Sequence, residues 1–250
     1  MGVFVGEMTR DEVNDAVKRC GFLVLPVGSL EQHGPHLPVD TDAFDATRAA
    51  ADAAREAGEP HPPVLPTIPY GVSHHHMGFG GTVTVSAETL IRTVVEVAES
   101  AGALGAKALL LVNGHGGNSG ALRVAMQRIR TELDMFAFMD DCAALARDVG
   151  RELFPQFFDV HAGAFETSVV LAVRPGAVRM ERIPESVEMS LPVEEPDKVG
   201  FSFRMEDLSR VGVLGRPWEH DVDKGAEFWR VEVEKLSGLM KTLRGRFGKS

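Results

Sequence analysis

The sequence predicts an α/β protein with a mostly parallel central sheet and helices on both of its faces, a three-layer α/β/α architecture. Short apolar runs alternate along the chain with longer segments that are rich in alanine or amphipathic. Strands that alternate with helices form parallel sheets, and strands buried on both faces are apolar throughout. The chain has 250 residues, 44% of them hydrophobic, and we find no internal repeat. We therefore expect one domain over residues 1–250.

The expected strands are short and apolar, and they comprise residues 21–29 (GFLVLPVGS), 106–114 (AKALLLVNG) and 135–140 (MFAFMD). An alanine-rich helix is expected over residues 41–58, with Gly58 at its end. Ser86 is expected to cap a second helix that has Glu88 in its first turn.

Further helices are expected over residues 119–133 and 223–244. Residues 60–85 contain many prolines and glycines, which predicts a long ordered loop with a short strand. Residues 176–220 are predicted to be irregular. Long loops in compact domains are usually functional, so residues 60–85 are a candidate part of the active site.

Composition excludes several classes of function. The net charge is −10 and the basic residues are dispersed, which argues against a nucleic-acid surface, because that needs clustered positive charge. The absence of a secretory signal or a membrane-spanning run predicts a cytoplasmic protein. Cys20 and Cys142 are too few for a disulfide framework or a thiolate zinc cluster, so we expect them to pack. A small-molecule or peptide partner is favoured.

Ionisable side chains gather in the loops that follow the predicted strands. Glu31, His33 and Asp42 follow the first strand, and His115 follows the second. The segment HAGAFETS presents His161 and Glu166. Ligand sites in open α/β sheets lie beyond the carboxyl ends of the strands, so these loops are expected to converge.

Carboxylates and imidazoles without thiolates suit Zn²⁺, Mn²⁺ or Fe²⁺. Residues two apart in an extended segment share a face, so Glu31 and His33 can point into one cleft, and Asp42 can reach it from the start of a helix. Each residue alone has a plainer interpretation, as a helix cap or a surface loop residue. Their concentration, and the glycines around His115, favour the metal.

Four segments together resemble the creatininase family of metal-dependent amidohydrolases: GSLEQHGPHLPVDTD, YGVSHHHMGFGGTVTVS, NGHGGN and HAGAFETS. The resemblance covers about residues 20–220. It implies a creatininase-like α/β/α fold, hydrolysis of C–N bonds with one or two divalent metal ions, and a homo-oligomer, either a hexamer or another dimer-based assembly.

The resemblance also implies roles for individual residues. Glu31, His33, Asp42 and His115 become metal ligands, with Asp42 as the bridge, and His161 becomes the proton shuttle. Asp40 and His36 become supporting or surface groups.

This chain departs from the creatinine-hydrolysing prototype in two places. Gly117 stands where the prototype has a glutamate ligand. Glu166 is the candidate replacement, either as a ligand and catalytic group or as a carboxylate that orients a ligand histidine. Phe157 and Phe158 replace a tryptophan-containing substrate gate. Creatinine is therefore not the expected substrate.

The resemblance places His75 and His76, with Ser73 and Asn118, in contact with substrate. We expect a small cyclic amide or a formamide. The alternatives are a formamidopyrimidine-nucleotide deformylase, whose phosphate could meet Arg48, Arg174 or Arg204, and a cofactor-maturation peptidase. A noncatalytic metal- or ligand-binding protein, and a hydrolase of cyclic ketones or lactones, also remain open.

Overall fold

A computed structural model describes residues 2–155, 159–193 and 201–249. At its centre, the strands β1 (Phe22–Val27), β2 (Ala108–Asn113) and β3 (Phe136–Asp141) form a parallel sheet in the order β1-β2-β3. Every residue of β1 and β2 is buried, whereas most of β3 is partly exposed at the edge. Burial on both faces explains why the first two strands are apolar without alternation.

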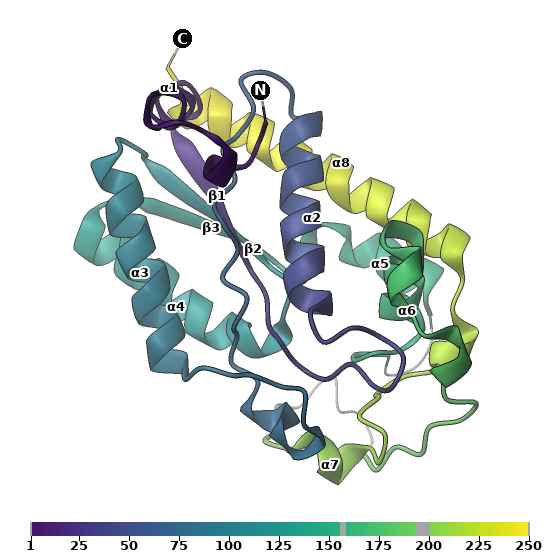
Figure 1. The fold of residues 1–250 in the computed structure, drawn as a ribbon. Coiled ribbons are helices and arrows are strands. Elements are labelled where there is room, and N and C mark those ends of the chain that lie inside the picture. Colours follow the sequence, from purple (N-terminus) through teal and green to yellow (C-terminus); the bar gives the residue numbers. More distant parts are fainter. Residues whose placement is uncertain (1, 156–158, 194–200, 250) are drawn as a thin grey trace.

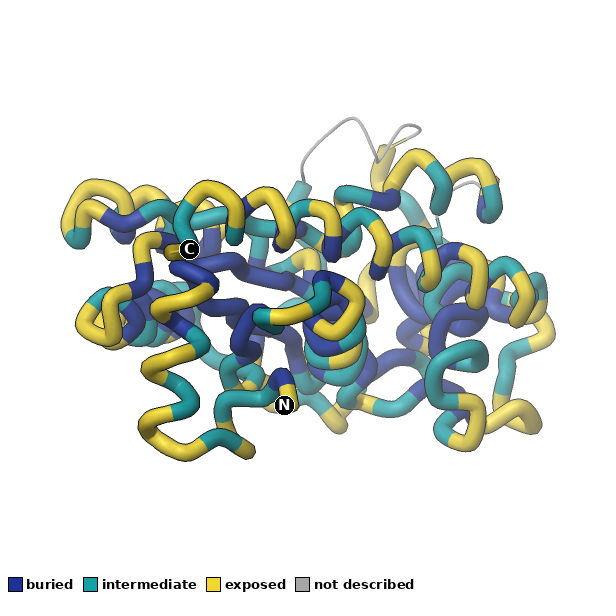
Figure 2. Tube along the Cα trace, turned by 90° about the horizontal axis from the view of Figure 1, so that it is seen from above, coloured by how far each residue is buried: buried dark blue, intermediate teal, exposed yellow. Residues whose placement is uncertain are grey.

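Helices cover both faces of this sheet (Figure 1). On one face, alternate strand residues such as Phe22 and Leu110 pack against α2 (Thr41–Glu56) and α8 (Val222–Phe247). On the other face, Leu23 and Leu109 pack against α3 (Ala87–Ala103) and α4 (Ser119–Leu133). Figure 2 shows the buried strands enclosed by helices whose outer sides are exposed. The predicted three-layer α/β/α fold is confirmed.

The expected helices occur, and Ser86 caps α3 by accepting a hydrogen bond from the Thr89 backbone N–H at 3.2 Å. The described residues form four further helices that were not predicted: α1 (Arg10–Cys20), α5 (Arg147–Leu153), α6 (Ala164–Val173) and α7 (Met205–Leu208). Short 3₁₀ turns complete the structure, and they span Val5–Glu7, His74–Phe79, Gly116–Asn118, Ala144–Ala146, Pro175–Ala177, Met180–Arg182 and Pro217–Glu219. None of the described helices is long and apolar enough to cross a membrane.

Residues 60–85 form the predicted long loop, but the described structure contains no regular strand there. Val64 and Ile68 make isolated parallel bridges to Val24 and Val27 of β1. The prolines among residues 60–69 have no backbone N–H to donate, so a continuous ladder cannot form. The loop continues into the 3₁₀ turn that carries the three histidines.

Two glycines bring α2 to the carboxyl ends of the strands. A Cβ at Gly28, after β1, would lie 2.3 Å from Ala43 Cα, and one at Gly114, after β2, would lie 2.3 Å from the Asp42 carbonyl oxygen. Such distances are far below van der Waals contact, so both positions require glycine for the first turn of α2 to enter here. This close packing delivers Asp42 to the edge of the sheet.

Candidate metal centre and active site

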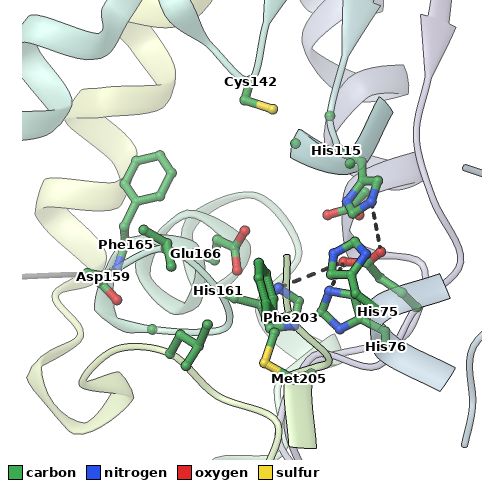
Figure 3. Close-up of a pocket in the computed structure, with 18 of the residues that line it drawn as sticks. His75, His76, His115, Cys142, Asp159, His161, Phe165, Glu166, Phe203 and Met205 are labelled. Carbon is green, nitrogen blue, oxygen red and sulfur yellow. Dashed lines mark hydrogen bonds and ion pairs between the residues drawn. The ribbon is translucent and has the colours of Figure 1, made fainter. Parts of the chain in front are cut away.

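A cavity of about 810 Å³ opens where β1 and β2 end and where α6 begins. Its lining includes six carboxylate and imidazole side chains that can bind a metal ion or transfer a proton: Glu31, Asp42, His76, His115, His161 and Glu166. Figure 3 shows His115, His75 and His76 on one side of the cavity and Glu166 across from them, while the His161 ring lies 4.4 Å from that of His76. The predicted loops therefore converge at one site.

Asp42 lies between two histidines. Its Oδ1 is 3.1 Å from His33 Nε2, and its Oδ2 is 3.2 Å from His115 Nδ1. On the far side of the His115 ring, Nε2 is 3.2 Å from Glu31 Oε2. Asp42 therefore turns one carboxylate oxygen toward each histidine.

Several of these atoms lack hydrogen bonds. Within the described part of the chain, Glu31 Oε2, His33 Nε2 and Asp42 Oδ2 are buried and have no partner in hydrogen-bond geometry. Leaving buried charged groups unsatisfied is costly, so such atoms point to a missing partner. Glu31, Asp42 and His115 also offer one ligand atom each within 4.8 Å of one another. These residues therefore fit a divalent metal ion.

The backbone orients two of the rings. His33 Nδ1 lies 3.1 Å from the Glu31 carbonyl oxygen, which can only accept, so this nitrogen is protonated whatever the charge of the ring, and Nε2 faces Asp42. His161 Nε2 lies 2.8 Å from the Gln32 carbonyl oxygen and is protonated for the same reason. Hydrogen bonds of this kind fix the tautomer and the ring orientation of metal-binding histidines.

Glu166 approaches this group from the first turn of α6. Its Oε2 accepts a hydrogen bond from the Ala162 backbone N–H and lies 3.9 Å from His33 Nε2. At Gly117, by contrast, a Cβ would lie 2.4 Å from both His115 Nε2 and the Val72 carbonyl oxygen. The backbone thus leaves no room for a side chain at Gly117, and Glu166 is the carboxylate that reaches His33 instead.

Interactions between neighbouring carboxylates and imidazoles shift the pKa values of His33, His115 and Asp42. Burial disfavours the charged form of His33, but Asp42, with Glu166 and Glu31, outweighs this and raises its pKa to about 10. The pKa of His115 is likewise raised against burial by Asp42 and Glu31. Burial works against ionisation of Asp42 as well, yet its pKa is lowered by His33 and His115. Imidazolium charges thus balance the carboxylates when no cation does.

Comparison with known proteins agrees with this geometry. The model of the creatininase family, described as creatinine amidohydrolase, matches residues 6–240. The chain belongs to the creatininase family.

Its relatives in this family carry different names. It is 35% identical to a mycofactocin precursor peptide peptidase of Mycobacterium tuberculosis, over 92% of this chain and 88% of that protein. It is 31% identical to a creatinine amidohydrolase of Pseudomonas putida, over 76% of this chain and 79% of that protein. It is 34% identical to a 2-amino-5-formylamino-6-ribosylaminopyrimidin-4(3H)-one 5'-monophosphate deformylase of Methanothermobacter thermautotrophicus, over 84% of this chain and 80% of that protein.

A crystal structure of creatinine amidohydrolase superposes with a TM-score of 0.84 at 26% identity, covering 100% of this chain and 99% of that one. Other solved creatininases of similar likeness include a manganese form and a mutant of Zn-Zn type.

The remaining predicted residues of this creatininase-family site divide into two groups. His75 lines the cavity, where its ring stacks on His115 at 5.7 Å between centroids and meets the edge of Phe203 at 5.4 Å. His76 also lines the cavity, but its Nε2 faces Glu31 Oε1 at 3.3 Å. His76 therefore lies directly beside Glu31, one of the residues that fit a metal ion.

Ser73 and Asn118 are fully buried and are not among the residues that line the cavity. Ser73 Oγ is 3.1 Å from His115 Nε2, so it supports that ring. Asn118 joins the loops by accepting from the Val72 N–H and donating to the Gly28 carbonyl oxygen. The structure places both as supports beneath the site.

The two supporting residues of the first motif, His36 and Asp40, lie in different environments. His36 is fully buried and is hydrogen-bonded to Thr167 Oγ1 at 2.9 Å, so it is not a surface residue. Asp40 pairs with Arg174 at 2.8 Å near the surface. Phe157 and Phe158, which stand in place of the prototype's substrate gate, lie outside the described residues.

Several residues that line the cavity were not predicted from the sequence. Phe201, Phe203 and Met205 form one wall, and Arg147 lies at another, whereas the three arginines considered for a phosphate do not line the cavity. The apolar cluster FSFRM within the polar 176–220 segment was the available signal. No sequence signal indicated Arg147, because only the turn after β3 brings this residue to the cavity.

Proposed function

We propose that this chain is a metal-dependent amidohydrolase that cleaves a C–N bond, with Glu31, His33, Asp42, His115 and Glu166 holding one or two divalent ions. One observation carries the proposal: buried carboxylate and imidazole atoms without hydrogen-bond partners converge around Asp42 at the base of an open cavity. The manganese and zinc forms of related creatininases support either ion, and Fe²⁺ suits the same ligands.

A bound divalent ion would lower the pKa of a water molecule and polarise the substrate carbonyl. His161 then supplies proton transfer. Its Nε2 is committed to the Gln32 carbonyl oxygen, so Nδ1 is the atom that accepts a proton and returns it to the leaving nitrogen. Burial, with His33 and His76 nearby, lowers the pKa of His161 well below its usual value, so the resting ring is neutral and its Nδ1 holds a lone pair. Glu166 lies at the edge of the site nearest His33.

For the substrate, we propose a small cyclic amide or a formamide. Its planar amide would lie against the aromatic wall formed by His75 and Phe203. A short peptide is the second candidate. The cavity of about 810 Å³ is in the upper part of the range for small-molecule sites, and the peptidase relative covers most of this chain.

A metal analysis followed by a hydrolysis screen tests the proposal. The purified protein should contain divalent metal and should hydrolyse a member of a panel of cyclic amides, formamides and short peptides. In His161→Gln, kcat should fall by about 10²–10⁴-fold with the metal content unchanged. Loss of metal in this variant would make His161 a ligand, and bound metal without turnover on the whole panel would favour a noncatalytic binding protein.

We also propose a cytoplasmic homo-oligomer formed by a single domain over residues 1–250. Exposed apolar side chains support the assembly, since Val39, Tyr70, Met77 and Val83 occupy neighbouring loops. Light scattering coupled to gel filtration tests it, and a monomer at micromolar concentration would contradict it.

A further inference from the structure

Gln32 is the residue between two proposed ligands, and its side chain reaches three segments of the chain. It is 6% exposed. Its Oε1 accepts a hydrogen bond from the Gly34 N–H at 3.0 Å, and its Nε2 donates to the Gly212 carbonyl oxygen at 3.0 Å. A Cβ at Gly212 would lie 2.1 Å from Gln32 Oε1. The amide is therefore enclosed by backbone on two sides.

These backbone groups fix the orientation of the amide. The Gly34 N–H can only donate, so the atom facing it must be the oxygen, and the Gly212 carbonyl can only accept, so the atom facing it must be the NH₂ group. One amide hydrogen remains. Two ring nitrogens lie near it, His76 Nδ1 at 2.9 Å and His161 Nε2 at 3.1 Å from Gln32 Nε2. His161 Nε2 donates to the Gln32 carbonyl oxygen and cannot accept, so the hydrogen goes to His76 Nδ1.

This hydrogen determines the tautomer of His76. Because Gln32 donates to Nδ1, that nitrogen carries a lone pair, and the ring proton lies on Nε2. His76 Nε2 faces Glu31 Oε1 at 3.3 Å. His76 thus presents an N–H to the Glu31 carboxylate. A protonated nitrogen cannot bind a cation, although His76, Glu31 and His161 lie close enough to hold one.

The main chain of the same residue determines the same Nε2–H tautomer in His161, but this ring turns its other nitrogen toward Glu31. The Gln32 carbonyl oxygen accepts from His161 Nε2 at 2.8 Å, so Nδ1 keeps its lone pair. His161 Nδ1 faces Glu31 Oε1 at 3.8 Å. Both hydrogens of the Gln32 amide are already used, so the amide offers none to this ring. One residue therefore turns a proton of His76 and a lone pair of His161 toward the same carboxylate.

We propose that Gln32 is a positioning residue that sets the tautomers of His76 and His161, so that His161 keeps a bare Nδ1 for proton transfer while His76 holds Glu31 as a hydrogen-bond donor. The catalytic part of this proposal rests on the proposed amidohydrolase function. The tautomers themselves do not, because they follow from hydrogen bonds within the chain.

The full-length Gln32→Glu protein tests the proposal. The new carboxylate can still accept from the Gly34 N–H but cannot donate to His76 Nδ1, so the His76 proton should move to Nδ1. Long-range ¹H–¹⁵N spectra of ¹⁵N-histidine-labelled, metal-free protein report this move as an exchange of the two ring-nitrogen shifts. The His76→Gln spectrum assigns the signals. With metal and substrate, kcat should fall by about 10–100-fold, with KM changed less than kcat.

A matched control is Thr82→Val. Thr82 Oγ1 accepts from the Gln32 backbone N–H at 3.0 Å, so this variant removes a tie between the same two loops and leaves the amide side chain intact. It should keep both tautomers and most of kcat. The proposal is overturned if Gln32→Glu folds and keeps the wild-type His76 shifts, or if both variants lose kcat equally with unchanged shifts. A wild-type protein that hydrolyses nothing would reject the proposed function, yet the spectra would still decide the tautomers.

Discussion

Glu166 Oε2 lies 3.9 Å from His33 Nε2, although His33 belongs to the loop after β1 and Glu166 to α6. Glu166 is 24% exposed, and burial raises its pKa to about 7. A nearby divalent ion would favour the ionised carboxylate. Glu166→Ala should therefore lose metal and about 100-fold or more of the activity, as measured by elemental analysis and kinetics.

The control is Asp40→Asn. Asp40 lies in the same loop as His33, and its side chain forms an ion pair with Arg174. The Asp40→Asn protein should keep its metal. If Glu166→Ala retains full metal content, Glu166 orients His33 and is not a ligand.

Gly117 and Gly116 offer a matched pair of substitutions. A Cβ at Gly117 would lie 2.4 Å from His115 Nε2, whereas a Cβ at Gly116 would meet nothing within 4 Å. We expect Gly117→Ala to destabilise the protein by about 1–3 kcal/mol and to weaken metal binding, because His115 must move. Gly116→Ala should be close to wild type. Urea unfolding and metal titration compare the two variants, and equal effects would contradict the packing argument.

Metal binding is expected to release protons. His33 has a pKa of about 10, and the pKa of His115 is raised well above its usual value. Both rings are therefore charged near pH 7 in the metal-free protein, and both must lose a proton to bind metal. Calorimetry in buffers of different ionisation enthalpy should report about two protons released per site, with affinity rising as pH rises. Release of none would show that these histidines are not ligands.

His36 is expected to make stability depend on pH. Burial is the main cause that lowers its pKa from 6.5 to about 4. The unfolded chain binds this proton more readily, so stability is fully present above about pH 6.5 and is lost as pH falls toward 4. The difference corresponds to about 3 kcal/mol. Urea unfolding of wild type and His36→Gln at pH 7.5 and 4.5 tests this, and equal pH dependence in the two proteins would contradict it.

The sequence by itself determined the strands, the main helices and the residues Glu31, His33, Asp42 and His115. These features are local, because apolar runs, caps and glycines act within one element, and parallel strands bring their carboxyl ends to one edge. The sequence did not determine which partner each side chain would find. His76 lines the cavity as predicted for a substrate contact, but nothing in the motif showed that it would also face Glu31 or that the Gln32 amide would reach Gly212.

Only the tertiary structure decided that Glu166 approaches His33. Its helix, α6, packs closely against α8, where a Cβ at Gly225 would lie 2.2 Å from the Ser168 carbonyl oxygen. That contact joins elements far apart in the chain, and local propensity carries no information about it. The proposed metal ligands could be predicted from the sequence because they follow strand ends, whereas the groups that orient them depend on how distant helices and loops pack.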